Sequence, residues 1–297
     1  MLPAVLTVFC WAISMSCAHR SALTLRSGAA ANLARLSLGT LLLALWAHLF
    51  GKGLGGAGLW WFVWSGFVGF GLGDLALYET LPRLGPRLSA VLAQCLATVF
   101  GTLIEWLWLG TRLSVAQMTA GAVVLVGVAL ALAPEEHVQR ERRVLLAGVV
   151  LGALAGLGQA VGAVLSRKAY LVTQLAGQTV DGGTAAYQRI IGGIGVVVVL
   201  FVWLARHSDG ERATPDRWRK AAPWIAANTL AGPVIGVTFY QWALSIAPSG
   251  VVLPIVATTP LAVVPLAYVL EGERPGVRSL AGGVLAVAGV VALTLAR

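Results

Sequence analysis

The sequence predicts an all-α integral membrane protein, in which ten transmembrane helices form two inverted repeats of five helices each. Three observations lead to this fold class. Hydrophobic residues make up 58% of the chain and only 11% are charged, whereas about 25% of the residues in a soluble domain are charged. Ten apolar runs reach the length of roughly 20 residues that a bilayer-spanning helix needs. Several distinctive residues also occur twice along the chain, in the same order.

The apolar runs follow one another through short links, none of which is long enough for a soluble domain. The runs are rich in Leu, Val, Ala and Gly, and they lack the strict alternation of a transmembrane β-barrel strand. Membrane helices tolerate Gly and Pro, because Gly permits close helix approach and neighbouring groups satisfy the backbone that Pro leaves free. The predicted helices cover about residues 2–19, 29–50, 58–81, 88–109, 115–133, 144–165, 183–204, 221–244, 250–271 and 277–296.

The repeat is visible as residue pairs at a nearly constant separation. A shift of 162 positions pairs Tyr78 with Tyr240, Pro86 with Pro248, and Arg112 with Arg274. A smaller shift of 154 pairs Arg35 in the second run with Arg189 in the seventh. These pairs predict a first five-helix repeat over residues 1–133, a short polar linker over 134–143, and a second repeat over 144–297.

The odd number of helices in each half has a geometric consequence. The chain leaves the fifth helix on the opposite side of the membrane, so the second half is inverted relative to the first. Inverted repeats are typical of secondary transporters, whose solute site lies at the repeat interface near the midplane.

The motifs of each half, taken in order, resemble the drug/metabolite transporter superfamily and its EamA-type ten-helix members. An Arg occurs in the second helix of each half, in "NLARLSLGTLLLAL" and "AAYQRIIGGIGVVVVL". An aromatic residue close to Ala-Leu occurs in the third, in "GDLALYETLPRLG" and "FYQWALSIAPSG". The family's fourth helix carries a Pro and is followed by a Gly-Glu-Arg break, which the second half keeps as Pro260 and "EGER". The first half departs from this pattern, since Thr98 and Thr111 replace the Pro and the Glu.

The resemblance implies a compact fold around a central cavity, lined mainly by the first, third and fourth helices of each half. It implies a secondary active transporter that moves a small organic solute, such as a metabolite, an amino acid or a drug-like compound, by alternating access. No enzymatic activity, cofactor or metal is expected. The expected partners are the lipid bilayer, the solute and a proton as the coupling ion. A functional monomer in the bacterial inner membrane fits this interpretation.

Two other classes of function fit the sequence less well than transport. A membrane-embedded lipid-processing enzyme should show clustered His, Asp or Glu at one membrane face, and the sequence does not; a lipid flippase stays an open alternative. A scaffold without transport activity does not explain the polar residues inside the spans. The net charge of +9 does not indicate nucleic-acid binding, because the 21 Lys and Arg are scattered over the links and form no basic stripe with aromatic residues. The three Cys have no CxxC spacing and predict no metal site.

Asp74 is the first candidate for a functional residue. It lies inside the third run, and charged side chains inside membrane spans usually face protein or a water-filled cavity. Tyr78 follows one helical turn later on the same face. We expect Asp74 to bind a cationic group or to couple transport to protons; a structural ion pair is the alternative.

Other charged residues near the spans are expected to be structural. Arg35 and Arg189 could bind a carboxylate through a two-pronged contact, but such residues more often cap helix ends or pair internally. Glu105 is followed by Trp106, which predicts an interfacial position in an aromatic belt. Glu273 belongs to the polar break before the last run.

Neutral polar and aromatic residues inside the spans complete a predicted solute cavity of amphipathic character. For each residue alone, hydrogen bonding between helices is the common role. Together with the aspartate, the candidate cavity residues are Trp11, Ser14, Asp74, Tyr78, Gln94, Thr98, Gln159, Tyr240 and Thr258.

The charges in the links bear on orientation. If both termini are cytoplasmic, as is usual in the family, fourteen Lys and Arg of the links lie outside and only five inside. The positive-inside rule prefers the reverse arrangement. We therefore expect both termini to lie outside the cytoplasm.

Overall fold

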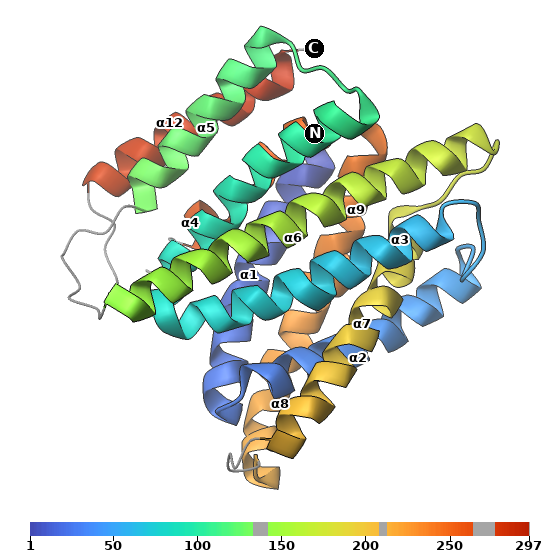
Figure 1. The fold of residues 1–297 in the computed structure, drawn as a ribbon, viewed down its shortest axis with the longest axis vertical. Coiled ribbons are helices and arrows are strands. Elements are labelled where there is room, and N and C mark those ends of the chain that lie inside the picture. Colours follow the sequence, from blue (N-terminus) through green and yellow to red (C-terminus); the bar gives the residue numbers. More distant parts are fainter. Residues whose placement is uncertain (133–141, 208–212, 264–276, 297) are drawn as a thin grey trace.

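The computed structural model describes residues 1–132, 142–207, 213–263 and 277–296, and all regular secondary structure in these ranges is helical (Figure 1). In chain order the helices are α1 (Leu2–Leu25), α2 (Gly28–Leu49), α3 (Leu59–Gly66), the π-helix η1 (Phe67–Gly73), α4 (Asp74–Leu109), α5 (Val115–Leu132), α6 (Arg142–Leu175), α7 (Gly182–His207), α8 (Pro215–Thr229), the π-helix η2 (Leu230–Gly236), α9 (Val237–Ile246), α10 (Ser249–Val256) and α12 (Val277–Leu295).

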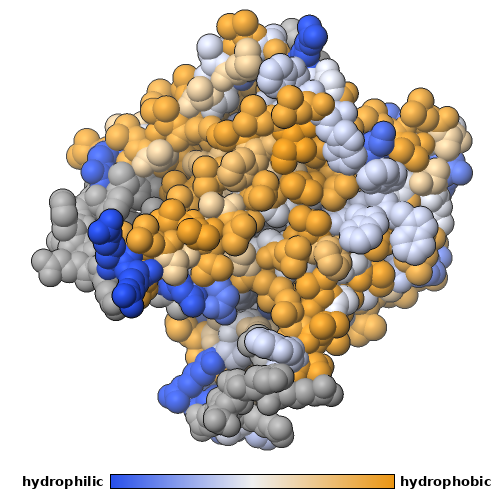
Figure 2. Space-filling view, viewed as in Figure 1, coloured by the Kyte–Doolittle hydropathy of each residue, from blue (hydrophilic) through white to orange (hydrophobic). Residues whose placement is uncertain are grey.

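The outer surface is that of a protein surrounded by lipid. Leu41, Leu107 and Val199 are each more than two-thirds exposed. Figure 2 shows hydrophobic residues over most of one face, with hydrophilic residues gathered towards its margins. Soluble monomers rarely expose a continuous apolar surface of this extent. In a membrane, the hydrocarbon tails of the lipids cover such a surface. Among the residues that the structure describes, five helical segments are long and apolar enough to cross a membrane: Leu2–Leu25, Gly28–Leu49, Val91–Leu109, Arg142–Leu175 and Gly182–Trp203.

Helix α6 lies between two stretches of the first half (Figure 1). On one side Gly152 neighbours Thr80, Gly158 neighbours Gly73 and Gly162 neighbours Gly69; on the other side Gly152 neighbours Leu92, Gly156 neighbours Ala97 and Arg167 contacts Glu105. As the residue numbers of α6 increase, the numbers of its neighbours decrease along the first side and increase along the second. The chain therefore reverses between residues 80 and 92, inside the single element α4, which holds the end of the predicted run 58–81 and the whole of the run 88–109.

The remaining helices pack in pairs that join the two halves. Helix α1 packs on α8 and η2, α2 packs on α7, and α4 packs on α10. Helices α5 and α12 lie side by side at one end of the molecule (Figure 1). Each of these contacts connects a helix of the first half with one of the second.

Glycines let α3 and α7 cross at very short range. A Cβ added to Gly66 would overlap the backbone of Arg189, and one added to Gly192 would overlap the backbone of Val63. Small residues at such crossings allow membrane helices to approach closely and gain van der Waals contact. Because Gly66 lies against the backbone of Arg189, this crossing fixes the position of Arg189 along α7 relative to η1, which follows α3 directly.

Outside the spans, Asp181 anchors the beginning of α7. Its carboxylate accepts hydrogen bonds of 3.0 Å from the backbone N–H of Thr184 and from Trp46 Nε1 of α2. Partial burial alone would raise the pKa of the Asp181 carboxyl, but the hydrogen bonds from Thr184 and Trp46 outweigh it and lower this pKa below its ordinary value. The ionised side chain thus caps α7 and ties it to α2.

Two of the predicted runs contain a change of helix type that the sequence did not indicate. The chain continues without a break from α3 through η1 into α4, and from α8 through η2 into α9. In both, a seven-residue π-helical segment interrupts the α-helical hydrogen bonding. Such π segments are rare and occur frequently at functional sites.

A pair of alanine variants on α7 tests the close crossing. Gly192→Ala should lower the free energy of unfolding by about 1–3 kcal/mol, because its Cβ would overlap the backbone of α3. Gly195→Ala is the control, since nothing lies within 4 Å of the added atom, and it should be neutral or stabilising because Ala favours helix over Gly. Melting curves of the purified proteins in detergent make the comparison. Equal melting temperatures for the two variants would contradict the crossing.

Candidate functional site

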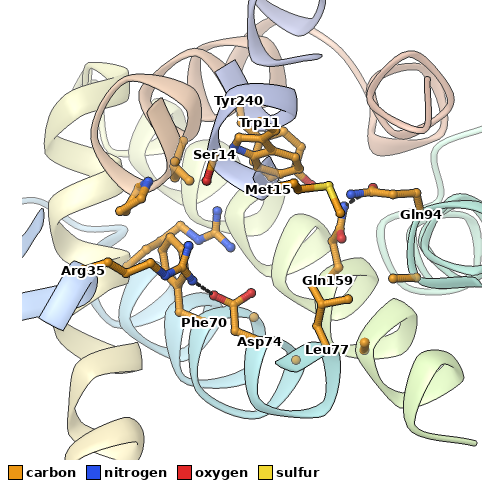
Figure 3. A pocket seen from close by; sticks show the side chains of 18 residues that line it. Trp11, Ser14, Met15, Arg35, Phe70, Asp74, Leu77, Gln94, Gln159 and Tyr240 are labelled. Carbon is orange, nitrogen blue, oxygen red and sulfur yellow. Dashed lines mark hydrogen bonds and ion pairs between the residues drawn. The ribbon is translucent and has the colours of Figure 1, made fainter. Parts of the chain in front are cut away.

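A cavity of about 120 Å³ lies between helices of both halves of the chain, and Figure 3 shows the side chains that line it. Its lining comes from α1, α2, η1, α4, α6, α7, η2 and α9. The lining residues are Trp11, Ser14, Met15, Arg35, Gly69, Phe70, Gly73, Asp74, Leu77, Ala93, Gln94, Ala155, Gln159, Arg189, Gly232, Pro233, Val237 and Tyr240.

One wall of the cavity carries an ion pair between α2 and α4. The guanidinium of Arg35 donates to the carboxylate of Asp74, the first residue after η1 (Figure 3). Arg35 also donates from Nε to Asn32 Oδ1 at 2.8 Å, and its Cζ lies 5.6 Å from the ring centroid of Tyr78. The Arg35 side chain is 9% exposed and that of Asp74 is 23% exposed. The carboxylate is therefore the more accessible member of the pair.

A second guanidinium, that of Arg189 on α7, lines the same cavity without a carboxylate bonded to it in the described part of the chain. Its Cζ lies 5.2 Å from the ring centroid of Phe70 and 5.9 Å from that of Tyr240, and such cation–π contacts partly compensate a buried charge. The residue is 5% exposed, and Nε has no hydrogen-bond partner among the described residues.

Glycines make the space in which the Arg189 guanidinium lies. A Cβ added to Gly69 of η1 would lie 2.9 Å from Arg189 Nη2, and one added to Gly162 of α6 would lie 3.3 Å from it. Any larger residue at either position would displace this end of the arginine. The two glycines thus allow a charged head group to reach the cavity from a crowded helix crossing.

The other walls combine aromatic and neutral polar groups. The rings of Trp11 and Tyr240 lie 5.1 Å apart, between α1 and α9. Gln159 Nε2 donates to Gln94 Oε1 at 2.7 Å, which joins α6 to α4 (Figure 3). Ser14 donates to Asn228 Oδ1 at 2.7 Å. The cavity can therefore hold a molecule that has both an apolar surface and hydrogen-bonding groups.

Comparison with known proteins places this architecture in a family. The model of the EamA-like transporter family matches residues 1–133 and 146–295. The chain belongs to the EamA-like transporter family. This match confirms the resemblance found in the sequence motifs. Members of the family are membrane transporters of small solutes rather than enzymes. Together with the apolar helices, this membership makes the chain a multi-pass membrane protein.

The search of curated proteins gave no match. A solved crystal structure, described only as that of a protein, superposes with a TM-score of 0.70 at 17% sequence identity. The superposition covers 99% of this chain and 94% of the other. At this identity the similarity supports the fold of the EamA-like chain and no particular substrate.

The structure brings six of the nine predicted cavity residues together: Trp11, Ser14, Asp74, Gln94, Gln159 and Tyr240. Tyr78 lies behind the lining, beneath Arg35. Thr98 is buried and donates to Gln94 O of its own helix, and Thr258 donates to Ile255 O. Neither threonine lines the cavity.

Glu105, for which the sequence suggested a place in an aromatic belt, is buried inside the protein in a structural ion pair. Glu105 is 2% exposed and its carboxylate accepts from Arg167 Nε at 3.4 Å and from the backbone N–H of Ser249 at 2.6 Å. Arg167 also donates to Leu244 O at 2.6 Å. The aromatic neighbours of Glu105 in the sequence suggested a membrane interface. Consecutive residues of a helix point in different directions, however, and the Glu105 carboxylate faces the protein whereas Trp106 is exposed. The carboxylate joins α4 to α6 and α10, and Arg167 connects this pair to α9.

Two predicted structural arginines, Arg35 and Arg189, line the cavity, and the first of them does pair internally. Glu273 lies outside the described residues. The apolar lining was not predicted, although helical spacing around predicted residues could have found part of it: Met15 lies one turn from Trp11, and Phe70 and Leu77 lie one turn on either side of Asp74. The same spacing applies to Val237, one turn before Tyr240, and to Ala155, one turn before Gln159.

A double-mutant cycle tests the ion pair. Asp74→Leu should destabilise the protein most, because it leaves a buried guanidinium uncompensated, and breaking a buried pair costs about 3–5 kcal/mol. Arg35→Met should cost less, since Asp74 is then still close to the positive charge of Arg189. The double variant should be more stable than Asp74→Leu alone.

The control for this cycle is the exposed pair of Glu79 and Arg83 on the same helix, 2.7 Å apart. Glu79→Gln should change the stability by less than about 1 kcal/mol. Melting temperatures in detergent give the comparison. Strictly additive effects of the two cavity substitutions would show that the pair makes no coupled contribution.

Proposed function

We propose that this protein is a secondary active transporter, which moves a small organic solute across the bacterial inner membrane by alternating access around the central cavity. The observation that carries the proposal is the position of the polar groups. Charged and hydrogen-bonding side chains from both halves meet at one cavity between membrane-spanning helices. Ionisable residues inside membrane spans mark solute and ion pathways, and transporters with repeats bind solute where the repeats meet.

The helix pairing supports two inverted repeats of five helices. In this proposal α1 corresponds to α6, α2 to α7, α3 with η1 to α8 with η2, and α5 to α12. If each helix is replaced by its counterpart in the other half, the contact of α1 with η2 becomes the contact of α6 with η1, and both contacts are present. The pairs α2–α7 and α5–α12 are each converted into themselves. A pseudo-two-fold axis in the membrane plane accounts for this pattern. The repeats would occupy residues 1–133 and 144–297, joined by the linker 134–143.

The size of the cavity favours a small solute. Its volume is about 120 Å³, whereas pockets for drug-sized ligands measure about 300–1,000 Å³. The mixture of aromatic rings, amides and charges suits a solute with an apolar body and a polar end. The proposed unit of function is a monomer, because both halves of one chain complete the cavity.

Asp74 is the proposed coupling group, since its carboxylate is accessible from the cavity and bonded to Arg35. A carboxylate that alternates between an ion pair and a protonated form links solute movement to protons. In proteoliposomes, Asp74→Asn should abolish the stimulation of uptake by a proton gradient, measured with a panel of labelled amino acids, organic acids and amines. Glu79→Gln, on the exposed face of the same helix, should keep it. Undiminished gradient dependence in Asp74→Asn would limit this residue to a structural role.

The orientation follows from the link charges. With both termini outside, the side richer in Lys and Arg faces the cytoplasm. A C-terminal fusion to a reporter that is active only outside the cytoplasm should therefore give signal, and a fusion to one that fluoresces only in the cytoplasm should stay dark. The opposite pair of results would show that the family's usual orientation holds here.

A further inference from the structure

The two halves of the protein differ at one corresponding position of the cavity. Tyr78 and Tyr240 correspond in the repeat, and the residue four positions earlier is Asp74 in the first half and Gly236 in the second. Each tyrosine ring lies near the corresponding arginine, since Arg35 Cζ is 5.6 Å from the Tyr78 ring centroid and Arg189 Cζ is 5.9 Å from that of Tyr240. The first half thus holds an arginine, a tyrosine and a carboxylate, and the second half holds only the arginine and the tyrosine.

The missing carboxylate cannot be supplied at position 236 without rearrangement. A Cβ added to Gly236 would lie 2.6 Å from Trp11 Cδ1 and 2.8 Å from Trp11 Nε1. The indole of Trp11 occupies the space beside Gly236 and lines the cavity. In place of a carboxylate at this position, Gly236 therefore lies against the indole of Trp11, which belongs to the first half of the chain and lines the cavity.

The charges around the cavity do not balance. Among its described lining residues, Arg35 and Arg189 are cationic and Asp74 is anionic, so the lining carries one net positive charge. The next buried carboxylate, Glu105, is bonded to Arg167 and Ser249. Asp74 bonds to Arg35, although it also attracts Arg189 electrostatically. An uncompensated buried charge is expensive, and an anion in the cavity would relieve that cost.

Two buried polar atoms without partners belong to residues that line the cavity. Arg189 Nε and the Tyr240 hydroxyl have no hydrogen-bond partner among the described residues, and both residues line the cavity. Guanidinium groups bind carboxylates through two parallel N–H donors, which are among the stronger hydrogen bonds in proteins. The ring of Trp11 and the side chain of Phe70 supply apolar surface next to these donors.

We propose that the solute is an organic monocarboxylate with a short apolar body, and that Arg189 binds its carboxylate. This inference rests on the proposed transport function and specifies its substrate class. The carboxylate takes the place that Asp74 fills beside Arg35 in the first half. Its apolar body lies against Trp11 and Tyr240. A monoanion balances the single net charge of the lining.

Binding of three aromatic probes of similar size to the purified protein in detergent tests the charge preference. Benzoate, benzamide and benzylamine each join one phenyl ring to one small polar group, and they carry a negative, a zero and a positive charge. Isothermal titration calorimetry at neutral pH should show that the wild-type protein binds benzoate at least tenfold more tightly than either of the others. This comparison needs no variant. Equal or tighter binding of benzamide or benzylamine overturns the proposal.

Variants locate the benzoate site. Arg189→Gln should weaken benzoate binding at least tenfold, and Arg189→Lys should restore part of it, since the charge returns without the two-pronged geometry. Gly69→Ala, which keeps the arginine but displaces its Nη2, should also weaken it. The control Arg83→Gln lies on the exposed side of α4 and should bind benzoate like the wild type. Unchanged benzoate binding in Arg189→Gln overturns the assignment.

Chloride and phosphate separate organic from inorganic anions. Binding of either ion as tight as that of benzoate and equally dependent on Arg189 would overturn the organic class. Uptake of the three labelled probes into proteoliposomes separates this inference from the function on which it rests. Transport of benzamide or benzylamine without benzoate refutes the monocarboxylate class and leaves transport standing. Benzoate binding without uptake of any solute in the panel refutes the transport function.

Discussion

A charge inside a membrane protein has to be compensated, because removing an ion from water into a low-dielectric interior costs several kcal/mol. This constraint organises the described interior. Arg35 and Asp74 neutralise one another across α2 and α4, and Glu105 and Arg167 do so across α4 and α6. Both pairs fix the position of α4, whose two stretches lie on opposite sides of α6. The arrangement of the helices around the cavity therefore depends on where these charges meet.

The same constraint explains the density of glycine around Arg189. A guanidinium can be held over aromatic rings only if the helices leave a slot of suitable size, and Gly69 and Gly162 leave that slot between η1 and α6. Close packing of α3 against α7, at Gly66 and Gly192, brings the arginine to the right level. Glycines therefore have two effects here: they let neighbouring helices pack closely, and they leave space for the long side chain of Arg189.

The membrane fold and part of the site could be predicted from the sequence, because hydropathy and the expense of a buried charge act on single residues. Asp74 was recognisable for this reason, as was the pair of arginines at corresponding places. Contacts that depend on helix rotation were not recognisable. The neighbouring tryptophans suggested an interfacial position for Glu105, yet the rotation of α4 turns its carboxylate towards Arg167. Whether an arginine finds a partner depends on residues far away in the sequence, such as Gly236 and Trp11.

The π-helical segments have a consequence for the history of the chain. A π segment, with its i→i+5 hydrogen bonds, accommodates an extra residue within a helix and rotates everything that follows. Segments η1 and η2 both have seven residues, and both line the cavity and lead directly into helices that also line it, α4 and α9. A single insertion, copied with the rest of the chain, explains the two π segments with fewer events than two independent insertions. Under the repeats proposed above, one insertion that preceded the duplication accounts for both segments, and Asp74 and Gly236 mark a position at which the two repeats differ chemically.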